Sequence, residues 1–108
     1  MEIIDYHTEG GKNLIKEYLS SLPVPERTYG YGIRHKVINE GLSAFEGLDT
    51  RQLFGKLWEI KFFSSRIMYV IFNKDTVYFL HACKKQKGKV EKFELEKAIE
   101  RAKEHNLL

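Results

Sequence analysis

Hydrophobic residues in the first half of the chain recur at helical spacing in two places. The first set is Leu14, Ile15, Tyr18, Leu19 and Leu22. It predicts a helix over about residues 11–21, ended by "LPVP" because proline disfavours helix in the residue before it. The second set is Ile33, Val37, Ile38, Leu42 and Phe45, and it predicts a helix over about 26–46. The short apolar cluster in "MEIIDYH" predicts a brief strand ahead of both helices.

From Leu53 onward the spacing of apolar residues changes to two, which is typical of strands. In "LWEIKFF", Trp58, Ile60 and Phe62 share one face, whereas the other face mixes apolar and charged residues. We expect Ser64-Ser65 to reverse the chain into a strand over 66–72, and the polar residues 73–75 to reverse it again into a strand over 77–83. The pattern predicts a three-stranded antiparallel meander.

A last periodic stretch predicts an amphipathic helix over about 91–105. The element order is then β-α-α-β-β-β-α, an α+β fold in which two N-terminal helices and a C-terminal helix pack on a small, mostly antiparallel sheet. A chain of 108 residues that is 43% hydrophobic fits one domain over 1–108. With one cysteine, no signal peptide and no apolar run long enough for a membrane helix, we expect a cytoplasmic protein.

The charge distribution changes this picture more than the net charge of +3 does. Residues 1–50 carry a charge of −3, residues 51–89 carry +7 from nine basic and two acidic side chains, and residues 90–108 carry −1. A basic segment of this kind indicates a polyanionic or acidic partner. The alternative is that its lysines only protect a sheet edge from aggregation.

Familiar catalytic motifs are absent from the sequence. No closely spaced cysteine and histidine set suits zinc, because Cys83 is the only cysteine and forms at most a weak pair with His81, and neither a P-loop nor a "GxSxG" motif occurs. Two acids in the basic segment are too few for a two-metal nuclease, so we expect no metal and no cofactor. RNA can be cut without a metal when its 2′-OH attacks the adjacent phosphorus while side chains move protons and neutralise charge. An arginine fork suits the charge-neutralising task.

The basic candidates for such a site are Lys61, Arg66, Lys84 and Lys85, provided that the meander brings its strand ends together. Each has a structural alternative. Arg66 could instead pair with Glu59 across the hairpin, the lysines after the last strand could be solvated, and His81 could be a hydrogen-bonded structural histidine.

The stretches "LFGKLWEIKFFSSRIMYVIF" and "VYFLHACKKQKGK", followed by a charged amphipathic helix, resemble the RelE/ParE superfamily of toxins from type II toxin–antitoxin modules. The phage-derived HigB-like subgroup is the most similar. The resemblance rests on "LWEIK" over 57–61, on the "RxxY" that begins at Arg66, and on the basic pair Lys84-Lys85 after the last strand. It covers nearly the whole chain and implies the RelE-like fold.

The resemblance implies an endoribonuclease that cuts mRNA on ribosomes and is inhibited by a cognate antitoxin, a helix-turn-helix protein of the HigA-like type. It implies that Arg66 stabilises the transition state at the phosphate and that Lys84 and Lys85 contact RNA or transfer protons. Further residues follow as candidates. The RNA-binding candidates are Lys56, Lys61, Lys87 and Lys89, and the acid or base candidates are His81 and His105.

The sequence departs from this family pattern in two places. The subgroup often has Thr-Pro near Lys89-Val90, and relatives often place a catalytic tyrosine near the C-terminus, where this chain has His105. Two alternatives therefore stay open, because a fold does not fix a function. One is a ParE-like inhibitor of DNA gyrase without nuclease activity, and the other is a catalytically weakened remnant. The lysines retained after the last strand favour the nuclease.

Overall fold

The computed structural model describes residues 1–85 and 87–108, with Val90 described through its backbone alone. In chain order the elements are β1 (Glu2–Asp5), α1 (Leu14–Ser20), α2 (Val24–Glu40), the 3-10 helix η1 (Gly41–Gly47), β2 (Thr50–Phe54), β3 (Leu57–Phe62), β4 (Ser65–Asn73), β5 (Thr76–Lys84) and α3 (Lys89–Glu104). Among the described residues, the strands form one five-stranded sheet in the order β1-β5-β4-β3-β2. The predicted α+β fold is confirmed.

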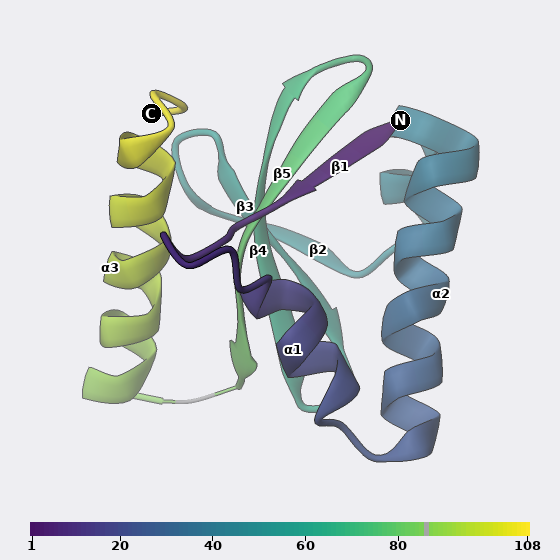
Figure 1. Ribbon diagram of the computed structural model, residues 1–108, viewed down its shortest axis with the longest axis horizontal. Helices are drawn as coiled ribbons and strands as arrows, with labels where there is room; N and C mark the ends of the chain where they lie inside the picture. Colours follow the sequence, from purple (N-terminus) through teal and green to yellow (C-terminus); the bar gives the residue numbers. More distant parts are fainter. Residues whose placement is uncertain (86) are drawn as a thin grey trace.

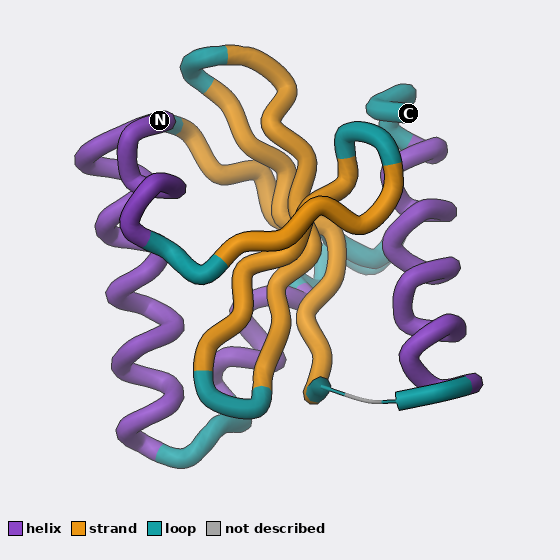
Figure 2. The backbone as a smooth tube through the Cα atoms, turned by 180° about the vertical axis from the view of Figure 1, so that it is seen from behind, coloured by secondary structure: helices purple, strands orange, loops and turns teal. Residues whose placement is uncertain are grey.

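The sheet lies between two helical layers. Figure 1 shows α1 and α2 on one side of the strands and α3 on the other, and Figure 2 shows the strands (orange) twisting between them. A larger core between the sheet and α1–α2 includes Ile15, Val37, Ile60 and Phe79. A smaller core joins Met68 and Leu80 of the sheet to Ala98 and Ala102 of α3. Both faces of the sheet are therefore covered.

The predicted meander is present as β3, β4 and β5, but its first turn is shifted by one residue. Phe63 and Ser64 make the turn, and Phe63 has a left-handed φ of 51°. Ser65 already belongs to β4, where it is buried and its Oγ lies 2.7 Å from the hydroxyl of Tyr18. The expected reversal at Ser64-Ser65 is wrong because this hydroxyl pair fixes Ser65 inside the sheet.

The predicted helices are confirmed with different ends. The first begins at Leu14 because Asn13 caps it, its side chain accepting a hydrogen bond from the Lys16 amide at 2.9 Å. The second ends at Glu40 because Gly41 takes a positive φ of 70°. The remaining apolar residues that extended the prediction to residue 46 lie in η1.

Sequence patterning did not resolve β2 as a separate strand. It pairs with β3 in antiparallel register as the edge of the sheet, and most of its side chains are exposed. An edge strand of this kind has no buried face to produce a clear alternation. The first strand, β1, was predicted, and it pairs in parallel with β5. The addition of β2 matters because it brings Arg51 to the sheet.

In the described part of the chain, no helix combines the length and the apolar character that crossing a bilayer requires.

Candidate functional site

A row of polar residues crosses the α3-facing side of the sheet. The strand registers place Arg51 opposite Glu59, Lys61 opposite Arg66, and Arg66 opposite Cys83. Residues directly opposite each other on neighbouring strands share a face of the sheet. The row therefore runs from β2 to β5 beneath the first turns of α3, at the end where β3 stops and β4 begins.

Arg66 is buried and lies between two carboxylates. Its Nη1 is 3.3 Å from Oε1 of Glu59 and donates a hydrogen bond to Oε1 of Glu91 at 3.0 Å. Glu59 is completely buried, and Arg66 is 5% exposed. The pair between Arg66 and Glu59, which the sequence left as the alternative, is therefore present. Glu91 comes from the first turn of α3 and is the more accessible of the two acids.

Arg51 extends this cluster to the edge strand. Its Nε lies 2.9 Å from Oε2 of Glu59, and its Nη2 lies 3.7 Å from Oε1 of Glu91. Two guanidinium groups thus share two carboxylates. The pKa of Glu91 is held below its ordinary value of 4.5, first by the hydrogen bond and charge of Arg66 and then by the charges of Arg51 and Lys85. Glu91 is consequently ionised at neutral pH.

The buried part of this cluster is incompletely hydrogen-bonded. Within the described residues, both carboxylate oxygens of Glu59 and the Nε of Arg66 lack a hydrogen-bond partner, although arginine nitrogens lie within ion-pair distance of the carboxylate. Leaving a buried polar group unsatisfied costs about 1–3 kcal/mol, so such atoms call for an explanation. Of these two residues, Arg66 lines a cavity of about 450 Å³ whose lining also includes Arg51, Met68, Glu91 and Lys92. A fixed cationic fork thus borders a space large enough for a ligand.

The structure places some of the predicted lysines on the Arg66 side of the sheet and others elsewhere, and the described lining of the cavity includes Lys92 but none of the predicted lysines. Lys61 lies opposite Arg66 on the same face. Lys85 donates its backbone N–H to the carbonyl of Ser64 at 2.7 Å, and its charge acts on Glu91. Lys84 lies opposite Ser65, so it belongs to the face that α1 covers. The predicted pair Lys84-Lys85 is therefore divided between the two faces.

Other predicted site residues lie at a distance from Arg66. Lys56 directly precedes β3, whereas Lys61 lies near the other end of β3, opposite Arg66 of β4. Five residues of a strand separate Lys56 from Lys61, which is about 16 Å along the strand axis. His105 caps the far end of α3, where its ring packs against Tyr6 and Tyr78. Lys87 and Lys89 are exposed around the start of α3. Neither Lys56 nor His105 converges on Arg66.

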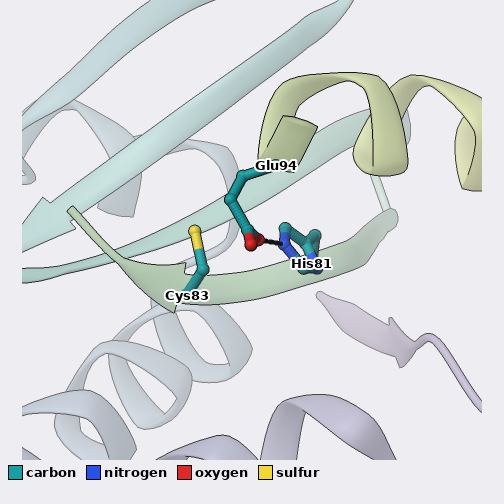
Figure 3. Close-up of side chains that lie close together, drawn as sticks. All are labelled: His81, Cys83 and Glu94. Carbon is teal, nitrogen blue, oxygen red and sulfur yellow. Dashed lines mark hydrogen bonds and ion pairs between the residues drawn. The ribbon is translucent and has the colours of Figure 1, made fainter. Parts of the chain in front are cut away.

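His81 lies beyond Cys83 in a second polar cluster (Figure 3). Its Nε2 is hydrogen-bonded to Glu94, and Nη1 of Arg101 donates to its Nδ1 at 2.9 Å and to the carbonyl of Leu80 at 2.9 Å. Because a guanidinium only donates, Nδ1 must accept, and Nε2 carries the hydrogen that goes to Glu94. Burial lowers the pKa of His81, against the raising effect of Glu94. The histidine is therefore neutral and hydrogen-bonded on both sides.

The same cluster contains three side chains that could ligate a metal. One ligand atom from each of His81, Cys83 and Glu94 lies within 4.8 Å of the others, and nitrogen, sulfur and oxygen donors of this kind suit zinc. The hydrogen bonds oppose this use, because Arg101 faces Nδ1 and leaves the proton on the nitrogen that a metal would need. Burial, followed by Glu94, also raises the pKa of the Cys83 thiol to about 12. Hydrogen bonding accounts for the cluster better than a metal does.

Sequence reasoning missed Arg51, Glu91 and Glu94 as members of these clusters. Arg51 was missed because β2 was not recognised, and the two glutamates because an exposed helix face normally carries such residues. Glu59 was considered only as a rival partner for Arg66. A charged residue in the middle of a buried strand was the one indication in the sequence that a polar network crosses the sheet.

Comparison with known proteins gives one family. Among curated proteins, none matches the chain significantly. The profile of the family described as "Phage derived protein Gp49-like (DUF891)" matches residues 17–103, from within α1 to the last turn of α3. That family is related to the RelE/HigB-like toxins. Since the match spans well over half of the chain, the protein belongs to the phage-derived Gp49-like family.

Proposed function

We propose that this protein is the toxin of a type II toxin–antitoxin module and that it cuts mRNA on the ribosome as a metal-independent endoribonuclease. A cognate helix-turn-helix antitoxin would inhibit it. Membership of a toxin-like family supports the general class. The observation that carries the activity is the buried fork of Arg66, incompletely hydrogen-bonded and bordering a cavity with basic side chains around it.

In this proposal a phosphate of RNA takes the place of the Glu91 carboxylate on Arg66. Both are oxyanions that accept from a guanidinium, and Glu91 lies on the accessible side of the arginine. Glu59 holds the arginine from the buried side and limits its rotation. The fixed positive charge can then stabilise the extra negative charge that develops on the phosphorane oxygens.

Cleavage also requires a proton to leave the 2′-OH and another to reach the departing 5′ oxygen. Lys85 and Lys61 are better placed for these roles than Lys84, because they share the side of the sheet on which Arg66 lies. His81 has both ring nitrogens engaged by Arg101 and Glu94. It serves as an acid or base only if one of those partners moves away.

The first test replaces the buried ion pair of the site without leaving an unpaired charge. Removing one partner alone is strongly destabilising, whereas a neutral pair of similar volume is tolerated. The variant is therefore Glu59→Gln with Arg66→Met. The matched control is Asp5→Asn with Arg34→Met, because Arg34 forms a buried bidentate pair with Asp5 at 2.7 and 2.8 Å away from the site. Circular dichroism checks that both variants fold.

We expect expression of the parent and of the control to arrest growth and to create new mRNA 5′ ends, and the Glu59/Arg66 variant to do neither. Arrest by a folded Glu59/Arg66 variant as strong as that of the parent would disprove the role of Arg66. A DNA-damage response with intact transcripts would instead indicate the gyrase inhibitor. Failure of the parent both to arrest growth and to cleave message would indicate the weakened remnant.

A further inference from the structure

An exposed aromatic ring lies at the tip of the β3–β4 turn. Phe63 is 61% exposed and adopts the left-handed backbone conformation, with φ of 51°. A large non-glycine residue in that conformation is strained, and exposing its ring to water adds a further cost. The turn conformation does not require a phenylalanine, since glycine or asparagine would make the same turn more easily.

The ring of Phe63 is held in place by other rings. It packs edge-on against Tyr29 of α2, with centroids 5.7 Å apart, and Tyr29 stacks on the buried Phe62 at 6.0 Å. Tyr29 is itself 52% exposed. Contacts of this kind fix an aromatic ring at little entropic cost and leave part of its surface free. Phe63 and Tyr29 therefore form an ordered, accessible aromatic surface.

Basic residues lie at the same end of the sheet as this surface. Lys61 precedes Phe63 by two residues, and the turn residue Ser64 accepts the backbone hydrogen bond of Lys85. Lys84 lies opposite Ser65, on the same face as Phe62. Figure 1 shows the turn after β3 at the same lower end of the sheet as the end of β5. Aromatic side chains among cations are the arrangement that binds single-stranded nucleic acid, through stacked bases and held phosphates.

We propose that Phe63, supported by Tyr29, is a stacking platform for an unpaired base of the RNA strand whose phosphate lies at Arg66. This inference rests on the proposed function for its substrate. Charge complementarity favours RNA over a protein partner, because the lysines at this end of the sheet suit phosphates and would be costly to bury under an apolar protein surface. Stacking tolerates any base, so the platform adds affinity for unpaired strands without a fixed sequence preference.

The structure supplies a matched control in Phe72. It is 59% exposed and packs edge-on against Tyr78, with centroids 5.9 Å apart, compared with 61% and 5.7 Å for Phe63. It lies near the other end of β4, next to the turn into β5, away from Arg66 and Lys85. Phe63→Ala and Phe72→Ala thus remove similarly exposed rings, one from the turn before β4 and one from near the end of β4.

The experiment measures binding of a single-stranded 2′-O-methyl oligoribonucleotide, which cannot be cut by 2′-OH attack, and of the same strand with abasic sites. Stacking on one base contributes about 5- to 150-fold in affinity. We expect Phe63→Ala to lose this factor on the intact strand and to equal the parent on the abasic strand. Phe72→Ala should match the parent on both strands, and Phe63→Trp should retain tight binding.

Phe63→Gly separates binding from folding. Glycine relieves the left-handed strain, so this variant should unfold at the same or a higher denaturant concentration than the parent while binding the intact strand as weakly as Phe63→Ala. Equal affinity of the parent for intact and abasic strands, or unchanged binding by folded Phe63→Gly, would overturn the platform and leave the RNA substrate standing. Absence of binding to either strand by the parent would overturn the platform as well, whereas the proposed function is decided separately by growth arrest and new mRNA 5′ ends.

Discussion

Arg66 is the residue on which the proposed site depends, and its surroundings limit what it can do. Glu59 faces it from the buried side, and Glu91 accepts its hydrogen bond from the side of α3. Both acids neutralise the arginine in the free protein. An incoming phosphate must therefore compete with a carboxylate that the protein itself supplies, and that competitor is Glu91 because Glu59 is buried.

Replacing Glu91 with glutamine should strengthen binding of the oligoribonucleotide by about two- to fivefold, the factor expected when one ion pair with a half-exposed carboxylate no longer competes. The lowered pKa of Glu91 means that the competing charge is fully present at neutral pH, so fluorescence anisotropy at pH 7 is a suitable measurement. Glu96→Gln, which changes an exposed acid on the same helix, is the control. Weaker binding by Glu91→Gln than by Glu96→Gln would show that Glu91 aids the substrate.

At the scale of the element, α3 has two different halves. Its second half packs Ala98 and Ala102 on the sheet as part of an apolar core. Its first half reaches the sheet through ionised and polar contacts, from Glu91 to Arg66 and from Glu94 to His81. Contacts of the second kind depend on protonation, so the attachment of α3 should be sensitive to pH.

His81 gives this dependence its sign. Burial lowers the pKa of its imidazole below the ordinary value of 6.5, so between the two values the unfolded chain binds more protons than the folded chain. The free energy of unfolding from this group is therefore highest above pH 6.5 and falls as the pH decreases towards the folded-state pKa. In urea titrations, the free energy of unfolding should fall less between pH 7.5 and pH 5.5 for His81→Gln than for the parent.

His35→Gln is the matched control, because His35 is exposed on α2. We expect it to lose as much stability between the two pH values as the parent does. Equal losses for all three proteins would mean that the protonation of His81 does not contribute to the pH dependence.

For the whole molecule, the fold concentrates a basic surface that the net charge of +3 conceals. Lys61 and Lys85 lie at the same end of the sheet, whereas Lys74 lies in the turn at the other end. Each phosphate contact on a single strand contributes about 0.7 to the slope of log affinity against log salt concentration. The effect of a lysine on this slope should therefore depend on whether it lies near the proposed site.

The double change Lys61→Ala with Lys85→Ala removes two phosphate contacts and should therefore reduce that slope by about 1.4. The measurement is oligoribonucleotide binding at salt concentrations from about 50 to about 300 mM. Lys74→Ala should leave the slope unchanged. A reduction of similar size for Lys74→Ala would indicate diffuse attraction by the whole molecule and no localised site.

Particular residues show how far the sequence could be interpreted. Alternation from Leu57 to Cys83 predicted the meander because backbone pleating places every second residue on the same face. Helical spacing predicted α1, α2 and α3 with errors at their ends, where Asn13 and Gly41 act through local capping. The edge strand β2 was missed because exposed strands carry little hydrophobic pattern.

The sequence by itself determined the α+β class, the covered meander and the basic segment, since these follow from periodicity and charge. Only the tertiary structure decided which charges meet. It separated Lys84 from Lys85 by strand pleating, placed Lys56 and His105 far from Arg66, and brought Glu91 and Glu94 of α3 onto the sheet. Those contacts join residues distant along the chain, and their geometry depends on strand register and helix placement, which local patterns do not encode.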